Sequence, residues 1–279
     1  MRIGRIPYVN CYPVYGAIDR GIVTLDAELI DGVPTALNRQ MAIGALDVSV
    51  VSAVEYARNA SRYLLLADLA ISCDGPVRSV ALFSRRPAHE LDGRPVVVSR
   101  SSMTSAALLE LLFEHVWHAR PQFVPGDAEL SDVARFDAEP HDARLVIGDA
   151  ALLLTADHAA RESGAYEHIY DLGAEWKAWT DLPFVFAVWV AQRATASDRA
   201  LEASAALRAS RDWGLEHLPI LADQAASVTG VARATCLEYL SGLDYGLSYA
   251  HLAGLTEFLR RLVAAGRVPN GSLAFLPAA

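Results

Sequence analysis

The amino-acid sequence predicts an α/β fold made of two lobes. The chain has 279 residues, which is more than a single hydrophobic core usually serves. Strand-like and helix-like segments alternate over residues 1–80, and this order favours a mostly parallel sheet covered on both faces. From residue 198 onward the pattern is almost entirely helical. These observations indicate a sheet-based first lobe, a second α/β lobe and a helical C-terminal part.

Each element is predicted from hydrophobic periodicity and from the residues that begin or end it. Residues 2–6 alternate polar and apolar as in a short strand, Pro7 ends that run, and Pro13 lies near the start of a helix over 12–18. Ser52 and Glu55 have the spacing of a capping box, which predicts a helix start. Further strands are expected at 27–33, 47–51, 64–71, 77–84, 96–99, 144–147 and 184–190, and further helices from 34, over 52–58, over 105–118, from 150 and over 255–262.

The order of these elements predicts that one lobe is inserted into the other. Residues 1–85 and 185–279 would form the first lobe, with residues 86–184 as the second. The chain would cross between the lobes near Phe83 and near Val185, and these crossings would act as hinges. Two α/β lobes joined in this way enclose a ligand in the cleft between them.

Composition limits the classes of partner. The formal net charge is −9. Nucleic acids and anionic membranes are bound by basic surfaces, so this acidity argues against both, whereas an anionic small molecule responds to the local field of a pocket. We therefore expect a small-molecule ligand, no nucleic-acid partner and no membrane partner.

The sequence also predicts a cytoplasmic location. Polar residues interrupt each apolar run near the start of the chain, so no signal-peptide core is expected there. The longest apolar stretch, 182–191, is about half of the ~20 residues that a membrane-spanning helix needs. Cys11, Cys73 and Cys236 are widely spaced, which is typical of reduced thiols rather than of a disulfide framework.

A cluster of hydroxyl residues is the strongest local signal for a binding site. Ser101, Ser102, Thr104 and Ser105 stand between a predicted strand and a long apolar helix. The unpaired N–H groups at such a helix start, together with these hydroxyls, can bind a carboxylate or a phosphate without any lysine. The alternative is an ordinary helix cap, but a cap needs only one or two of the four side chains.

The opening loop predicts a second wall of the same cleft. Tyr8, Val9 and Asn10 connect the first strand to the first helix, a position from which α/β proteins present side chains to a ligand. We expect Asn10 to point into the cleft. The alternative is that Asn10 caps the helix, since Asn is a favoured cap residue.

Three further positions have both a structural and a ligand-binding interpretation. At the junction of a strand with a helix, Ile147 ends the strand and is expected at the site, Gly148 allows close backbone approach, and Asp149 fits either a cap or a contact with a substrate hydroxyl. Ser52 fits either its capping box or ligand binding, and Ser79 lies at or beside the first crossing.

Several signatures of cofactor chemistry are absent from the sequence. It contains no GxGxxG, no GxxxxGK[ST], no HExxH and no GxSxG. We therefore expect no nucleotide cofactor and no catalytic metal.

Six stretches, in this order and spacing, resemble one enzyme family. They are RIGRIPYVNCYPV, LDVSVVSAVEYAR, GPVRSVALFSRRP, the SSMTSAALLELL block, LVIGDAALL and YDLGAEWKAWTDLPFVFAVWV. Together they resemble the chorismate dehydratases of the futalosine route to menaquinone, which have the two-lobed fold of type II periplasmic binding proteins. The resemblance implies two mixed sheets flanked by helices, with a ligand cleft between the lobes.

The resemblance also implies a reaction, a hydro-lyase elimination. Chorismate, a dicarboxylate, would lose water across C3 and C4 to give 3-[(1-carboxyvinyl)oxy]benzoate. Asn10 and Ser79 would orient the departing hydroxyl and the ring, and Ser105 with its neighbours would hold a carboxylate. Two bases fit the C3 proton, either Asp149 or the enolpyruvyl carboxylate of the substrate itself.

Two other functions fit the same fold. One is a cytosolic solute-binding or sensor protein. The other is the sister 1,4-dihydroxy-6-naphthoate synthase, whose opening loop resembles SPCPNDT, whereas this chain has PYVN. The oligomeric state is not predicted.

Overall fold

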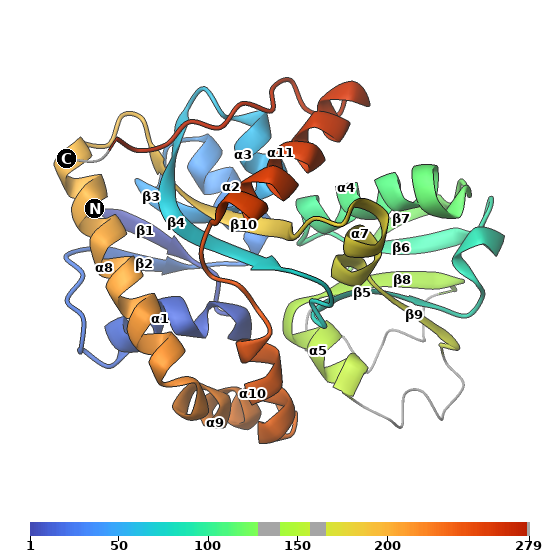
Figure 1. The fold of residues 1–279 in the computed structure, drawn as a ribbon, viewed down its shortest axis with the longest axis horizontal. Helices are drawn as coiled ribbons and strands as arrows, with labels where there is room; N and C mark the ends of the chain where they lie inside the picture. Colours follow the sequence, from blue (N-terminus) through green and yellow to red (C-terminus); the bar gives the residue numbers. More distant parts are fainter. Residues whose placement is uncertain (128–139, 157–165, 278–279) are drawn as a thin grey trace.

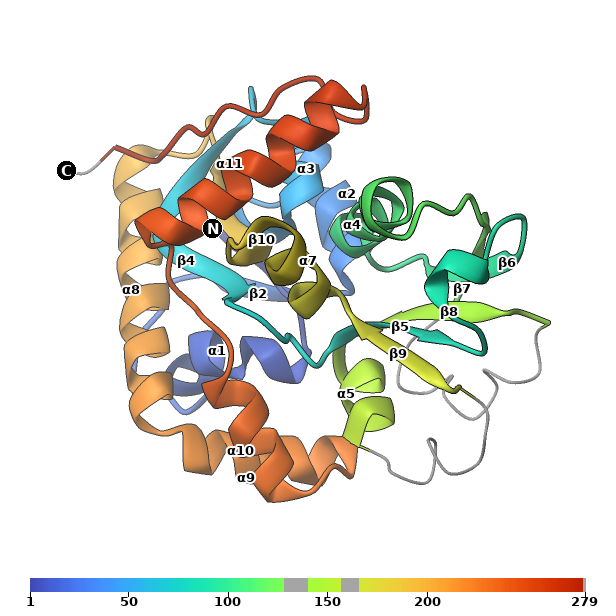
Figure 2. The ribbon, with the colours of Figure 1, turned by 45° about the vertical axis from the view of Figure 1, so that its right-hand side comes forward.

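Two five-stranded sheets, each covered by helices, form the body of the protein (Figure 1). The computed structural model describes residues 1–127, 140–156 and 166–277. The sheets have the strand orders β2-β1-β3-β10-β4 and β7-β6-β8-β5-β9. Figure 2 shows the second sheet with α5 on one side and α4 on the other, beside the larger first lobe.

The first sheet contains four strands that run in the same direction. β1 pairs in parallel with both β2 and β3, whereas β10 lies antiparallel between β3 and β4. The expected mostly parallel sheet is therefore mixed, because β10 returns from the second lobe in the opposite direction. The strands are β1 (Arg2–Arg5), β2 (Glu28–Asp31), β3 (Val48–Ser52), β4 (Tyr63–Cys73) and β10 (Phe184–Gln192).

The second sheet repeats this arrangement. β6 pairs in parallel with β7 and β8, and β5, which arrives from the first lobe, lies antiparallel between β8 and β9. Every residue of β3, β5 and β8 is buried, as expected for strands covered on both faces. The strands are β5 (Val80–Ser84), β6 (Pro95–Ser99), β7 (Gln122–Gly126), β8 (Ala143–Ile147) and β9 (His168–Asp171).

Membership of β5 in the second sheet changes the expected lobe boundary. The first crossing lies between Cys73, which ends β4, and Val80, which begins β5, rather than near Phe83. The strand predicted over 77–84 is accordingly shorter, and Ser79 belongs to the crossing. The second crossing precedes β10, which begins at Phe184.

Most helices begin near their predicted positions. The helix expected over 105–118 divides into α4 and a π-helical turn, which ends where His118 adopts a left-handed conformation. α8 packs along α1, and α11 packs on β10 and α3. In the described parts of the chain no helix is long and apolar enough to span a membrane. The helices are α1 (Tyr12–Asp19), α2 (Pro34–Ala42), α3 (Ala53–Arg58), α4 (Met103–Leu112), α5 (Gly148–Ala156), α7 (Leu172–Thr180), α8 (Ser197–Glu216), α9 (Leu218–Thr229), α10 (Arg233–Ser241) and α11 (Tyr249–Ala264), with the short turns η1 (Val9–Cys11), η2 (Ala88–Glu90) and η3 (Phe113–Trp117).

Candidate active site

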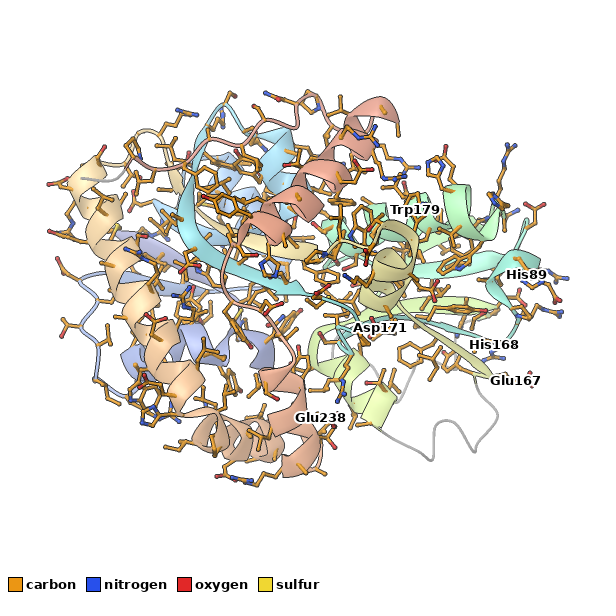
Figure 3. The ribbon with its side chains drawn as sticks, in the orientation of Figure 1. His89, Glu167, His168, Asp171, Trp179 and Glu238 are labelled. Carbon is orange, nitrogen blue, oxygen red and sulfur yellow. The ribbon has the colours of Figure 1, made fainter. Side chains whose placement is uncertain are left out.

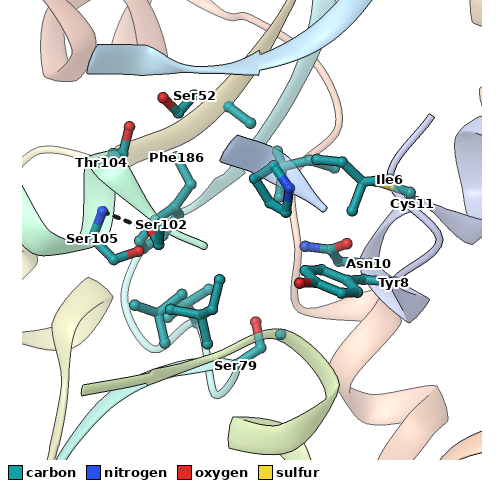
Figure 4. Close-up of a pocket in the computed structure, with 17 residues that line it drawn as sticks. Ile6, Tyr8, Asn10, Cys11, Ser52, Ser79, Ser102, Thr104, Ser105 and Phe186 are labelled. Carbon is teal, nitrogen blue, oxygen red and sulfur yellow. Dashed lines mark hydrogen bonds between the residues drawn. The ribbon is translucent and has the colours of Figure 1, made fainter. Parts of the chain in front are cut away.

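A pocket of about 630 Å³, including its opening to solvent, lies between the two lobes (Figure 4). It lies at the carboxyl ends of β1, β3 and β8, each of which is followed by a helix in the chain. Most of the predicted site residues meet here. The predicted residues that line it are Asn10, Ser52, Ser79, Ser102, Thr104, Ser105, Ile147 and Gly148.

The starts of four helices converge on this pocket. Pro34 is the first residue of α2, Ser52 and Ser102 are the N-caps of α3 and α4, and Gly148 is the first residue of α5. The amino end of each helix carries a partial positive charge and unpaired N–H groups. Among the described lining residues none is Asp, Glu, His, Lys or Arg. The groups among these residues that can stabilise negative charge are therefore backbone dipoles and uncharged polar side chains.

We call Ser52, Ser102, Thr104 and Ser105 the hydroxyl wall of the pocket. The Ser102 hydroxyl accepts a hydrogen bond from the Ser105 N–H at 3.2 Å, which caps α4. The Thr104 hydroxyl accepts one from the Val54 N–H at 3.1 Å, which connects α4 of the second lobe to α3 of the first. These side chains hold helix starts in place beside the pocket.

Ser52 caps α3, but the predicted capping box forms only in part. Its hydroxyl accepts a hydrogen bond from the Glu55 N–H at 3.1 Å. The Ser52 N–H donates to the side-chain oxygen of Asn38 at 3.2 Å, and the Glu55 carboxylate bonds Asn59 and Tyr63 instead. Asn38 thus takes the place expected for the Glu55 side chain in the capping box.

We call the opposite side, formed by Asn10 and Ser79, the Asn10 wall. Figure 4 shows the Asn10 side chain above the Tyr8 ring, with its nitrogen toward the pocket and its oxygen turned away from it. Cys11, not Asn10, is the N-cap of α1, so the capping alternative is wrong. The Asn10 side-chain oxygen is buried and has no hydrogen-bond partner within the described residues. A buried, unsatisfied oxygen costs about 1–3 kcal/mol. The side-chain nitrogen, which faces the pocket, is the group of Asn10 that can donate a hydrogen bond to a ligand.

Ser79 lies on the floor of the pocket in Figure 4, and it is 2% exposed. Its N–H donates to the Val77 carbonyl at 2.7 Å and its carbonyl accepts from the Gly148 N–H at 2.8 Å. Tyr239, on α10, lies beside it. Burial raises the pKa of the Tyr239 phenol, so the phenol stays protonated at neutral pH.

The backbone at position 148, which faces the Tyr8 ring, requires glycine. Its φ is +63°, and a Cβ at this position would lie 3.0 Å from a ring carbon of Tyr8. Both the backbone conformation and the close approach favour glycine. The Tyr8 ring therefore packs directly on the start of α5.

Asp149 and Ser101 do not line the pocket, unlike the other predicted site residues. The Asp149 side chain is 8% exposed, and its Oδ1 accepts a hydrogen bond from the Val9 N–H at 3.0 Å. Asp149 thereby connects α5 of the second lobe to the loop that carries Asn10. The Ser101 N–H donates to the Ser99 hydroxyl at 3.2 Å, so this residue shapes the loop behind the hydroxyl wall.

The sequence did not single out several lining residues. Tyr8 and Cys11 flank Asn10, so the same loop motif could have indicated them. Ile71 on β4 and Phe186 on β10 come from distant segments, and only the sheet order brings them together. Burial and the Asp149 charge raise the pKa of the Cys11 thiol, which keeps it protonated.

The two sheets and their helices define a class of two-lobed α/β proteins with the periplasmic-binding-protein-like fold, and solved structures share that fold. The fold is similar to protein AF1704 from Archaeoglobus fulgidus, with a TM-score of 0.78, 20% identity, and coverage of 96% of this chain and 98% of that one. It is also similar to the alkanesulfonate-binding protein SsuA from Xanthomonas axonopodis pv. citri bound to MOPS, with a TM-score of 0.69, 13% identity, and coverage of 98% and 96%. The predicted periplasmic-binding-protein-like fold is confirmed.

Within that class, the chain belongs to the menaquinone biosynthesis family, whose model matches residues 1–264. It is 31% identical over 268 residues to the chorismate dehydratase of Thermus thermophilus, an alignment that covers 92% of this chain and 95% of that protein. It is 27% identical over 191 residues to the chorismate dehydratase of Campylobacter jejuni, with coverage of 67% and 66%. The resemblance drawn from the sequence motifs is thus confirmed.

Proposed function

We propose that this protein is a chorismate dehydratase, a hydro-lyase of menaquinone biosynthesis. Its family and its relatives named chorismate dehydratase support this function. The structural observation that carries the proposal is the pocket, whose described lining residues carry no charged side chain and in which the Asn10 side-chain nitrogen faces a set of helix starts. Such a pocket suits a ligand that carries both carboxylates and a hydroxyl.

The pocket provides a separate environment for each part of chorismate. The carboxylates of the substrate would meet the amide groups at the helix starts beside the hydroxyl wall, where negative charge is stabilised. The ring would contact apolar lining residues such as Ile6, Ile71 and Phe186. The hydroxyl on C4 would lie at the Asn10 wall.

The elimination breaks the C3–H and C4–O bonds and releases one water. The electron pair of the C3–H bond becomes part of an aromatic ring as the C4 hydroxyl departs, and aromaticity provides the driving force. Asn10 and Ser79 would orient that hydroxyl and stabilise the charge that develops on its oxygen. The product is 3-[(1-carboxyvinyl)oxy]benzoate.

We propose that the enolpyruvyl carboxylate of the substrate takes the C3 proton. Asp149, the other candidate, is absent from the described pocket lining, and its Oδ1 accepts the Val9 N–H. A carboxylate on the substrate is already adjacent to C3, so the enzyme contributes mainly by fixing its orientation. The role of Asp149 is then to hold the loop of Asn10.

We also propose that the protein acts in the cytoplasm, on a small-molecule substrate, and has no nucleic-acid partner. Kinship with biosynthetic enzymes supports this location. Cys11, Cys73 and Cys236 are all free and buried, which fits a reducing compartment.

The test is an assay of the purified protein with chorismate and no added cofactor. We expect a product lighter by the mass of one water, with the ultraviolet absorbance of an aromatic ring. If chorismate binds but survives, the protein is a binding or sensor protein. If the substrate of the sister naphthoate synthase reacts instead, the assignment within the family is wrong.

A further inference from the structure

The first crossing between the lobes, which carries Ser79, has an unusual backbone conformation just before that residue. Arg78, the residue before it, has a φ of +61°, which non-glycine residues adopt rarely and at a cost. Such a conformation persists only where the surroundings hold it in place. The contacts of this segment therefore decide where the Ser79 hydroxyl points.

Asp171, the last residue of β9, contacts both the crossing and a helix. Its Oδ1 accepts hydrogen bonds from the N–H groups of Gly173 and Ala174, at 2.9 and 3.1 Å, and so caps α7. The same oxygen accepts the Val77 N–H at 3.0 Å. Its second oxygen, Oδ2, accepts the Arg78 N–H at 2.6 Å. Figure 3 shows Asp171 at the point where α7 meets the crossing.

Helix capping alone does not account for these contacts. A serine or asparagine caps a helix with one oxygen, whereas Asp171 directs its second oxygen to the amide of the residue with positive φ. The start of α7 is also fitted to the crossing, because a Cβ on Gly173 would lie 2.5 Å from the Gly75 carbonyl oxygen and 2.6 Å from the Cys73 sulfur.

Other groups hold the remaining atoms of the crossing. The Thr155 hydroxyl lies 3.0 Å from the Arg78 carbonyl oxygen and shares its one proton between this oxygen and two carbonyls of its own helix, at 2.9 and 3.0 Å. The Arg78 guanidinium pairs with Glu238 on α10. Asp171 thus binds the N–H groups of Val77 and Arg78 in the crossing, whereas residues of α5 contact the carbonyl groups of Arg78 and Ser79. The position of Ser79 depends on both.

We propose that Asp171 is a positioning residue for Ser79. Its carboxylate holds the Val77 and Arg78 amides, so that the next residue presents its hydroxyl to the pocket. This inference rests on the proposed function, because it assigns Ser79 a part in the reaction. Asp171 itself is not among the described lining residues of the pocket.

The variant that separates positioning from capping is Asp171→Ser. Serine remains a good N-cap but has one oxygen and a shorter reach. We expect the melting temperature to stay within about 4 °C of wild type. We expect kcat to fall about tenfold or more with KM nearly unchanged, since small misplacements of an orienting group reduce the rate steeply.

A double-mutant cycle with Ser79→Ala tests whether Asp171 acts through Ser79. In the Ser79→Ala background we expect Asp171→Ser to lower kcat by less than about twofold, because the group it positions is already gone. Equal losses in the two backgrounds would overturn the proposal. The matched control is Glu175→Gln, which neutralises a carboxylate in the same turn of α7; its kcat should match wild type.

Amide hydrogen exchange tests the same contact without any turnover. We expect the Val77 and Arg78 amides to exchange faster in Asp171→Ser than in wild type and in Glu175→Gln. Unchanged exchange would refute the positioning role. If the wild-type protein leaves chorismate intact, the proposed function fails, and the exchange measurement still decides whether Asp171 holds the crossing.

Discussion

The two walls of the pocket use polar side chains in opposite ways. On the hydroxyl wall, Ser52, Ser102 and Thr104 already accept hydrogen bonds from helix amides. On the Asn10 wall, the Asn10 oxygen is buried without a partner in the described part of the chain. The Asn10 side-chain nitrogen faces the pocket. The comparison teaches that the hydroxyls of one wall hold helix starts in place, whereas the amide of the other wall directs a donor at the ligand.

Asn10→Ala should have the largest effect and would test this distinction most directly. We expect kcat to fall about 10²-fold or more, on the scale of losing one donor to developing charge. The free energy of unfolding should change little, because the lost oxygen has no protein partner in the residues described. Steady-state kinetics and urea denaturation measure both. A kcat within threefold of wild type would show that Asn10 has no part in the chemical step.

Asp149→Asn should have a moderate effect, because the asparagine oxygen still accepts the Val9 N–H. We expect kcat to fall less than tenfold, whereas loss of a general base typically costs about 10²–10⁴. Single-turnover kinetics with chorismate measure the chemical step. A loss of about 10³-fold would make Asp149 the base and remove the case for substrate assistance.

Thr104→Val should reduce stability more than turnover. The change removes the acceptor of the Val54 N–H, so we expect a loss of about 1 kcal/mol in the free energy of unfolding, as for other helix caps. Ser101→Ala, three residues away and outside the described lining, is the control. Chemical denaturation checks the expected difference. A large fall in kcat with an unchanged free energy of unfolding would show instead that Thr104 takes part in the reaction.

Cys11→Ala should have the smallest effect: we expect it to leave the pH dependence of kcat unchanged. Burial, with the Asp149 charge, raises the pKa of the Cys11 thiol, so the thiol stays neutral where an ordinary cysteine, with a pKa of about 8.5, would ionise. We expect no step in the kcat profile from this group between about pH 7 and 9. Comparing the pH profiles of wild type and Cys11→Ala checks this. A step near pH 8.5 that the variant lacks would contradict it.

Local sequence signals located most of the pocket but not its connections. Ser102, Gly148 and Asn10 stand at strand–helix junctions, and such junctions are recognisable from a few neighbouring residues. The strand predicted over 77–84 is interrupted by the positive φ of Arg78, and nothing in this stretch indicated it. That conformation is held by the Asp171 carboxylate, which lies far along the chain. The direction of the Asp149 side chain likewise depends on the distant Val9 amide. Contacts between lobes are not encoded in any one stretch.

The hydrogen bonds that join the lobes in the described part of the chain include one from Val54 to Thr104 and one from Val9 to Asp149, both beside the pocket. Both donors are backbone amides of the first lobe, and both acceptors are side chains at helix starts of the second. Wide separation of the lobes must break both bonds. If product escape requires that separation, turnover would be limited by the frequency of opening rather than by bond cleavage. Weakening either bond would then shorten product residence time and make kcat less sensitive to solvent viscosity.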